Sequence, residues 1–470
     1  MSRKNRRKPI SIENIEILNT ASKGNSVAKH NGRVIFVKGG VPGDICDITV
    51  FKRRKKFWEA KIEKIIKKSR YRIKPKCTHF GTCGGCKWQN MHYEAQLEFK
   101  QNQVLDNFSK IGGVTIEKFN DILGSDKIYN YRNKMEFTFS NKRWLKEDEI
   151  KNDENIIDKN ALGFHVPGMF DKVIDLKKCF LQENPSNKIR NSVKEFALEN
   201  NLSFFDIRNQ KGFLRNLMIR NTNIGELMVL VQFYYEDKKK IDLLMNFIKK
   251  SFKEITSLLY TVNEKANNTI YDQKIICFYG RKYITEKIGD LSFKIGPKSF
   301  FQTNSDQAEV LYKSAKKLAD ITKNDTVYDL YTGTGTIAQF IASNAKKVIG
   351  IDSVPEAIEA ANLSAIDNNI SNCMFFAGDM KNMFSDNFIQ KNGKPDIIIT
   401  DPPRDGMHKK VIEQLLKIMC RRIVYISCNP ATQARDIALL KEKYEISNMQ
   451  TVDMFPHTHH VENILVLDLK

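Results

Sequence analysis

Apolar and polar positions alternate in short segments near the start of the chain, and this pattern predicts β-strands. Turn signals separate the segments, among them the pairs Gly39-Gly40 and Pro42-Gly43. The predicted strands cover residues 12–18, 33–37, 45–51 and 57–66. Short strands at this spacing are typical of a small β-barrel. We therefore expect a barrel domain over residues 10–72.

The pattern is mixed between residues 73 and 298, where we expect a central α+β domain. MEFTFS (135–140) and ELMVLVQF (226–233) indicate strands, and residues 240–250 indicate a helix. The pattern in this region identifies no chemistry.

Buried strands alternate with helices over residues 299–470, and each strand ends at an acidic residue. The strand ends fall at Asp329, Asp352, Asp379 and Asp401. This alternation predicts an α/β fold with a doubly wound, Rossmann-like parallel sheet, in which ligands bind at the carboxyl ends of the strands.

The first strand of this domain is followed by the turn YTGTG, which holds Gly333 and Gly335. The turn is GxG and not GxGxxG, which disfavours a dinucleotide pyrophosphate. Asp352, one strand later, is placed to bind ribose hydroxyls. Backbone approach plus a ribose carboxylate favours S-adenosylmethionine over NAD.

The positive charge of the chain lies mostly at its start. The 470 residues contain 76 Lys and Arg against 55 Asp and Glu, and residues 1–76 hold 22 and 6 of these. So uneven an excess predicts a module that binds a polyanion, with RNA, DNA and acidic lipid all still open. The run KRRKK (52–56) precedes Phe57 and Trp58, a combination that suits phosphate contact and base stacking.

Nine cysteines in a long chain argue against a disulfide framework. Cys77, Cys83 and Cys86 fall within the glycine-rich segment CTHFGTCGGC, and Cys179 is the best candidate for a fourth ligand. Zinc and iron–sulfur sites both commonly take four ligands, so the spacing leaves both metals open. The start MSRKNRRKP lacks an apolar signal core, and no apolar run reaches the length of a membrane span, so we expect a cytoplasmic protein.

Cys428 follows an apolar strand in the segment SCNP, and the sheet pattern places it at the same edge as Asp401. A thiol near a carboxylate at a ligand-binding edge suggests covalent catalysis. Glu462, beyond the turn DMFPHTHH, is placed to act as a base. Because a free thiol is mostly protonated at neutral pH, we expect turn amides or a basic side chain such as Arg435 near Cys428.

Several motifs in this order resemble the RNA (uracil-5-)-methyltransferase family, in its branch that acts on 23S ribosomal RNA. They are FFQTN (300–304), DLYTGTG, DPPRDG, SCNPAT and MFPHTHHVE, together with the cysteine segment. The resemblance implies a TRAM-type, OB-like barrel that binds RNA and a Rossmann-like catalytic domain over residues 299–470. It also implies that residues near 93–125 pack with the catalytic domain.

The resemblance implies specific roles for the candidate residues. Cys428 would be the nucleophile that adds to uracil C6, Glu462 the base that removes the C5 proton, and Asp401 a hydrogen-bond partner of the uracil. The positions that match the S-adenosylmethionine site are Gln302, Tyr331, Asp352 and Asp401, and the strand-end Asp379 is added to them. Cys77, Cys83, Cys86 and Cys179 match the ligands of a [4Fe-4S] cluster.

Two residues depart from the commoner family pattern. Thr332 stands where cysteine or serine is frequent, and Asp352 replaces a more usual glutamate. The shorter aspartate puts a direct bidentate contact with the ribose in question.

Two alternatives compete with a monomeric enzyme acting on 23S ribosomal RNA. One is a uracil-5-methyltransferase acting on the transfer RNA T-loop, against which the barrel and the cysteine segment count. The other is a non-catalytic RNA-binding or ribosome-assembly protein, against which the set Cys428, Asp401 and Glu462 counts.

Overall fold

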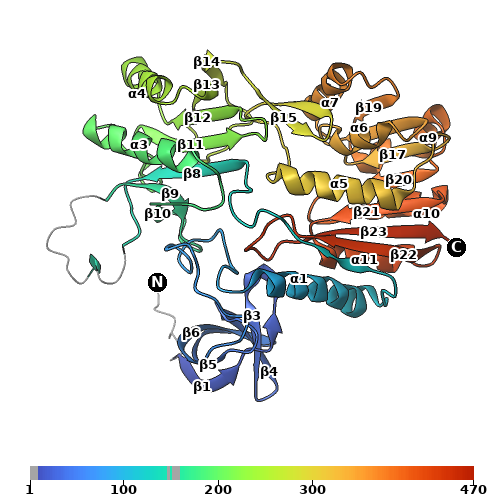
Figure 1. Cartoon of the computed structure of the whole chain (residues 1–470), viewed down its shortest axis with the longest axis horizontal. Coiled ribbons are helices and arrows are strands. Elements are labelled where there is room, and N and C mark those ends of the chain that lie inside the picture. Colours follow the sequence, from blue (N-terminus) through green and yellow to red (C-terminus); the bar gives the residue numbers. More distant parts are fainter. Residues whose placement is uncertain (1–8, 146–148, 151–158) are drawn as a thin grey trace.

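The computed structural model describes residues 9–145, 149–150 and 159–470, so the basic start of the chain, residues 1–8, lies outside the described part. Three main sheets organise these residues: one near the amino terminus, one in the middle of the chain, and one near the carboxyl terminus (Figure 1). Within the described ranges, none of the helices has the length and apolar character that a membrane crossing requires.

The amino-terminal sheet has six strands in the order β1-β5-β6-β4-β3-β2 and wraps around its own apolar core. Alternating residues of these strands, among them Ile12, Ile35 and Val50, point inward and are buried. The strands are β1 (Ile10–Glu16), β2 (Asn19–Thr20), β3 (Ser26–His30), β4 (Arg33–Lys38), β5 (Ile45–Arg53) and β6 (Phe57–Lys67). The pattern of the sequence predicted β1, β4, β5 and β6 but missed β2 and β3.

The central sheet has seven strands in the order β10-β9-β8-β11-β12-β13-β14. Its strands are β8 (Lys134–Ser140), β9 (Ala161–His165), β10 (Val173–Asp175), β11 (Leu214–Asn221), β12 (Leu227–Phe233), β13 (Ile255–Val262) and β14 (Ile276–Gly280). Helices α3 (Ser186–Glu199) and α4 (Lys238–Ser251) pack on this unit and on each other, through Phe196 stacked on Phe247 at 4.0 Å. The hairpin of β15 (Ile284–Ile288) and β16 (Leu291–Ile295) contacts two helices of the carboxyl-terminal unit, α5 (Ser305–Ala319) and α7 (Pro355–Asp367).

The carboxyl-terminal sheet has eight strands in the order β19-β18-β17-β20-β21-β23-β22-β7. Its strands are β17 (Thr326–Leu330), β18 (Lys347–Asp352), β19 (Cys373–Ala377), β20 (Ile397–Thr400), β21 (Arg422–Ser427), β22 (Tyr444–Val452), β23 (Glu462–Leu469) and β7 (Asn120–Leu123). The helices are α5 (Ser305–Ala319), α6 (Thr336–Ala342), α7 (Pro355–Asp367), α8 (Met380–Met383), α9 (Asp386–Asn392), α10 (Lys409–Ile418) and α11 (Pro430–Leu440). Strands β19, β18, β17, β20 and β21 run parallel, as the alternation of strands and helices predicted.

Two elements of this last unit come from before the central sheet in the sequence. Strand β7 pairs parallel with β22, with Asn120 opposite Gln450. Helix α1 (Tyr93–Asn107) continues into the helical turn Phe108–Gly112 and packs against α11 (Figure 1). The unit around the last sheet is therefore assembled from two separate stretches of the chain.

Candidate active site

The strand order brings the predicted nucleophile and base to one edge of the last sheet. Strands β17, β20 and β21 are neighbours and parallel, so the residues that follow them, Tyr331, Asp401 and Cys428, leave the sheet on the same side. Strand β23 runs antiparallel to β21, with Ser427 opposite Asn463. Glu462, the first residue of β23, therefore lies beside Cys428.

The acidic groups at this edge raise each other's pKa. Burial raises the pKa of Cys428 to about 11, and the charges of Glu462 and Asp401 add to the shift. Burial raises the pKa of Asp401 to about 7, although this residue keeps partial contact with solvent. Burial and then Asp401 raise the pKa of Glu462 well above its ordinary value. The thiol of Cys428 therefore holds its proton at neutral pH, and nearby positive charge favours its ionisation.

Arg404 supplies positive charge to this cluster. Its side chain hydrogen-bonds Cys428 and lowers the pKa of the thiol, against the larger effect of burial. The main-chain carbonyl oxygen of Arg404 accepts hydrogen bonds from Asn429 Nδ2 at 2.8 Å and Thr432 Oγ1 at 3.1 Å. The turn that carries Arg404 is therefore fixed to the segment that carries Cys428.

Arg435, which the sequence suggested as the cation near the thiol, is bound elsewhere. Its guanidinium contacts Asp436 Oδ1 at 2.7 Å and donates to the Asp405 carbonyl oxygen at 2.9 Å. The prediction of a basic neighbour was right, but it named the wrong arginine. Arg404 lies within the motif DPPRDG, and this position in an active-site turn was the signal that could have identified it.

The glycine-rich turn after β17 leaves open space over its backbone. Gly333 has φ +55°, and a Cβ placed there would meet nothing within 4 Å. Asp352 holds the turn, because its Oδ2 accepts from the Gly333 amide and its Oδ1 from the Val354 amide, each at 2.9 Å. Both oxygens of the Asp352 carboxylate therefore already accept hydrogen bonds from backbone amides.

Asp329 and Thr332 form a buried pair beneath this turn. Thr332 Oγ1 donates to Asp329 Oδ2 at 2.5 Å, and the Ala338 amide donates to the same oxygen at 3.1 Å. Asp329 is fully buried, and its Oδ1 has no hydrogen-bond partner in the described part of the chain. Burial raises the pKa of Asp329 to about 7. Thr332, which departs from the commoner family pattern, thus uses its hydroxyl to hydrogen-bond the buried carboxyl group of Asp329.

The other residues predicted to bind the cofactor lie partly at the sheet edge and partly outside the sheet. Burial raises the pKa of Tyr331 to about 12, and Tyr331 has φ +65° in the glycine-rich turn. Asp379 is exposed and caps α8, accepting from the Lys381 amide at 3.1 Å. Gln302 lies in the loop before α5, where its main-chain carbonyl oxygen accepts from Asn133 Nδ2 at 2.9 Å. Tyr331, Asp352 and Asp379 share the sheet edge with Cys428, whereas Gln302 comes from outside the sheet.

Four thiols from two segments of the chain line one cavity, together with Phe164 and Leu176. These thiols are Cys77, Cys83, Cys86 and Cys179. Burial raises the pKa of Cys83 to about 11 and that of Cys86 to about 12. Over residues 9–145, 149–150 and 159–470, no group of three or more His, Cys, Asp or Glu side chains is arranged to hold a single metal ion.

Comparison with known proteins identifies the family. Residues 271–470 match the family model of tRNA (Uracil-5-)-methyltransferase. An uncharacterized RNA methyltransferase of Bacteroides thetaiotaomicron is 51% identical over 96% of this chain and 100% of its own length. A second one, from Porphyromonas gingivalis, is 48% identical over 96% of this chain and 99% of its own. The chain belongs to the RNA methyltransferase family.

The chain shares its fold with a solved RNA methyltransferase over nearly its whole length. The crystal structure of Pyrococcus abyssi tRNA (uracil-54, C5)-methyltransferase in complex with S-adenosyl-L-homocysteine matches with a TM-score of 0.74 and 28% identity. The match covers 96% of this chain and 100% of that one. S-Adenosylmethionine-dependent RNA methylation is thus supported by the family and by the fold.

Proposed function

We propose that this RNA methyltransferase methylates C5 of a uridine in 23S ribosomal RNA through a covalent adduct with Cys428. The observation that carries the proposal is the placement of Cys428 beside Glu462, with Asp401 and Arg404 at the same sheet edge. The positive charge at the start of the chain supports the barrel, residues 10–72, as an RNA-binding domain.

Uracil C5 must first be made nucleophilic. The thiolate of Cys428 forms a bond to C6, and the electron pair of the C5–C6 double bond moves to C5 and O4. Asp401 accepts or donates a hydrogen bond at the ring while this enolate forms. C5 then forms a bond to the methyl carbon with this electron pair, while the electrons of the broken S–CH3 bond stay on sulfur and give neutral S-adenosylhomocysteine.

Glu462 completes the reaction by removing the proton from C5. The C6–S bond then breaks, and the double bond and the Cys428 thiolate return together. The nucleophile and the base must reach the same ring from two positions. Antiparallel strands β21 and β23 provide that spacing.

The chain offers a site suited to S-adenosylmethionine at the end of β17. The space over Gly333 admits a ligand close to the backbone, and the unpaired Oδ1 of Asp329 is an acceptor for an ammonium group. Tyr331, Asp352, Asp379 and Gln302 would complete this site. S-Adenosylmethionine supplies an electrophilic methyl group on a positively charged sulfur.

A transfer RNA is the second candidate substrate, and a specific observation favours it. The P. abyssi enzyme, whose described activity is on a transfer RNA uracil, is matched along its entire length. A barrel before the methyltransferase domain therefore does not by itself distinguish ribosomal from transfer RNA. The four-cysteine cavity and the resemblance to the 23S branch are the arguments for ribosomal RNA.

We also propose that Cys77, Cys83, Cys86 and Cys179 hold a [4Fe-4S] cluster. The four thiols line one cavity, an arrangement that suits the four cysteine ligands of an iron–sulfur cluster. The resemblance of the cysteine segment to that of the 23S branch is the argument for iron–sulfur over zinc.

The surroundings of the four thiols suit an anionic group. The Gly85 amide donates to Cys83 Sγ at 3.5 Å. The buried cation of Arg190 lowers the pKa of Cys179, against the larger effect of burial.

RNA that contains 5-fluorouridine tests the proposed reaction, because fluorine at C5 cannot leave as a proton. We expect wild-type protein with S-adenosylmethionine to form a denaturant-stable adduct with such RNA. Cys428→Ala should form none, and Cys277→Ser serves as a matched cysteine control. Fragments of 23S ribosomal RNA and transfer RNA, tested separately, identify the substrate. An undiminished adduct in Cys428→Ala would overturn the proposed nucleophile.

A further inference from the structure

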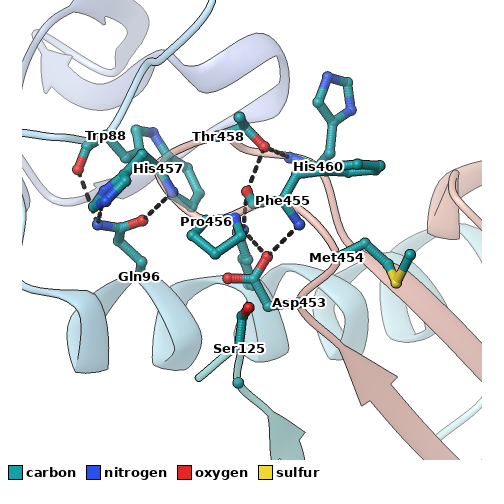
Figure 2. Close-up of polar contacts among 12 residues, drawn as sticks. Trp88, Gln96, Ser125, Asp453, Met454, Phe455, Pro456, His457, Thr458 and His460 are labelled. Carbon is teal, nitrogen blue, oxygen red and sulfur yellow. Dashed lines mark hydrogen bonds and ion pairs between the residues drawn. The ribbon is translucent and has the colours of Figure 1, made fainter. Parts of the chain in front are cut away.

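The loop between β22 and β23 delivers Glu462 to the active site, and it is long for a connection between antiparallel strands. Hairpin loops usually have about two to five residues, whereas this one spans residues 453–461. A loop of that length needs anchors if the residue at its end is to stay in place. The anchors come from α1 and from the segment that leaves the cysteine cavity (Figure 2).

A buried ion pair holds the beginning of the loop. Lys100 and Asp453 are both fully buried, with Nζ and Oδ1 at 2.6 Å. Lys100 Nζ also donates to the Phe455 carbonyl oxygen at 3.2 Å, and Tyr93 donates its hydroxyl hydrogen to Asp453 Oδ2 at 2.9 Å. Two residues of α1 thus satisfy both oxygens of one loop carboxylate.

A buried amide holds the middle of the loop. Gln96 Oε1 accepts from the His457 amide at 2.8 Å, and Gln96 Nε2 lies 3.2 Å from His457 Nδ1 (Figure 2). The same Nε2 donates to the carbonyl oxygens of Trp88 and Met91 at 3.0 and 2.9 Å. Gln96 is fully buried and therefore joins three segments of the chain without contact with water.

The segment after the cysteine cavity holds the same loop residue from the other side. The amides of Lys87 and Trp88, which directly follow Cys86, both donate to the carbonyl oxygen of His457, at 2.8 and 3.0 Å. His457 has φ +64°, an uncommon conformation that these contacts stabilise.

We propose that Gln96 and Lys100 are positioning residues for Glu462, which fix the loop 453–461 so that the carboxyl group meets C5 of the uracil. The inference rests on the proposed function, since it concerns the step that Glu462 performs. Neither side chain touches the reacting groups. Their loss should therefore slow proton removal while leaving formation of the Cys428 adduct intact.

The test separates the two halves of the reaction in the full-length protein. Gln96→Leu, Lys100→Met and the double variant Lys100→Met/Asp453→Asn are incubated with S-adenosylmethionine and either uridine RNA or 5-fluorouridine RNA. We expect trapping by 5-fluorouridine RNA within about twofold of wild type. With uridine RNA we expect methylated, denaturant-stable adduct to accumulate at least tenfold over wild type, because its breakdown needs Glu462.

The variants guard against a mere loss of folding. Lys100→Met leaves Asp453 buried without its cation, whereas the double variant removes both charges and Gln96→Leu removes none. Lys110→Met, which breaks the exposed pair with Asp106 just beyond α1, is the matched control and should behave as wild type. Folded variants whose adduct breaks down at the wild-type rate would overturn the proposal. Absence of trapping in wild-type protein would instead overturn the proposed function.

Discussion

Glu462 lies beside Cys428 and raises the pKa of its thiol. The two residues stand at the ends of antiparallel strands, because Ser427 pairs with Asn463. The group assigned to begin the reaction is thus electrostatically coupled to the group assigned to end it. Each should change the behaviour of the other.

Glu462→Gln should stop the reaction after methyl transfer. The amide cannot take the C5 proton, so the methylated adduct with Cys428 persists and turnover falls about 10²–10⁴-fold, the usual contribution of a general base. Gel electrophoresis under denaturing conditions, with a labelled methyl group, measures the adduct. Adding Cys428→Ala should abolish the adduct, and turnover by Glu462→Gln at the wild-type rate would contradict the assignment.

The same substitution should stabilise the protein at alkaline pH. The pKa of Glu462 is raised in the folded state, so the wild-type fold loses stability as pH rises above the unfolded value of about 4.3. Glutamine cannot ionise. We expect Glu462→Gln to melt a few degrees above wild type at pH 8 and to match it near pH 4.5. The control Glu413→Gln, at an exposed position of α10, should be unchanged at both. If the melting temperature of Glu462→Gln rose further above wild type as pH fell, the prediction would be contradicted.

Arg404→Gln should make Cys428 less reactive. Arg404 lowers the pKa of the thiol, so its loss raises a pKa that already stands at about 11. We expect alkylation of Cys428 by iodoacetamide at pH 8.5 to slow at least threefold, measured by mass spectrometry of the peptide that contains it. Arg404→Lys should recover part of the rate, and Arg435→Gln should leave it unchanged. If alkylation slowed equally in Arg435→Gln, the assignment of Arg404 as the cation that lowers the pKa of Cys428 would be wrong.

Replacing a ligand of the four-cysteine cavity should remove its metal. Cys179→Ser and Cys83→Ser, purified without oxygen, should lose most of their iron and acid-labile sulfide, while Cys277→Ser keeps both. The thiols come from segments far apart in the chain, so loss of the cluster should also lower the melting temperature. Zinc in place of iron in anaerobically prepared wild-type protein would contradict the proposed cluster.

The hydrophobic pattern predicted the parallel strands of the carboxyl-terminal sheet well, because each strand has its own local signal in the sequence. Buried runs of β-branched residues that end in an acid, each followed by a helix, specify parallel strands without knowledge of the rest of the chain. Strands β2 and β3 were missed, since β2 has only two residues. No local pattern could pair β7 with β22, because that contact joins residues near 120 to residues near 450.

The candidate site divides in the same way. Asp401 and Cys428 could be placed together from strand order, since the carboxyl ends of parallel strands share an edge, whereas Glu462 reaches that edge on an antiparallel strand that the pattern did not predict. The choice between Arg404 and Arg435 could not be made, because it depends on side-chain direction: Arg435 points to Asp436 on its own helix. The anchors of the loop 453–461 are equally non-local, as Gln96 and Lys100 show no sequence signal that links them to it.

Assembly of the last sheet from two distant stretches has a consequence for biosynthesis. Helix α1 and β7 leave the ribosome before the central sheet, whereas α11 and β22, against which they pack, are made after it. Domains tend to fold in order as the chain emerges, so α1 must wait with its apolar and charged faces uncovered until α11 and the loop 453–461 have been made. A product truncated before β22 would therefore keep α11 against α1 but would lack Glu462 and the loop 453–461 that Lys100 and Gln96 hold.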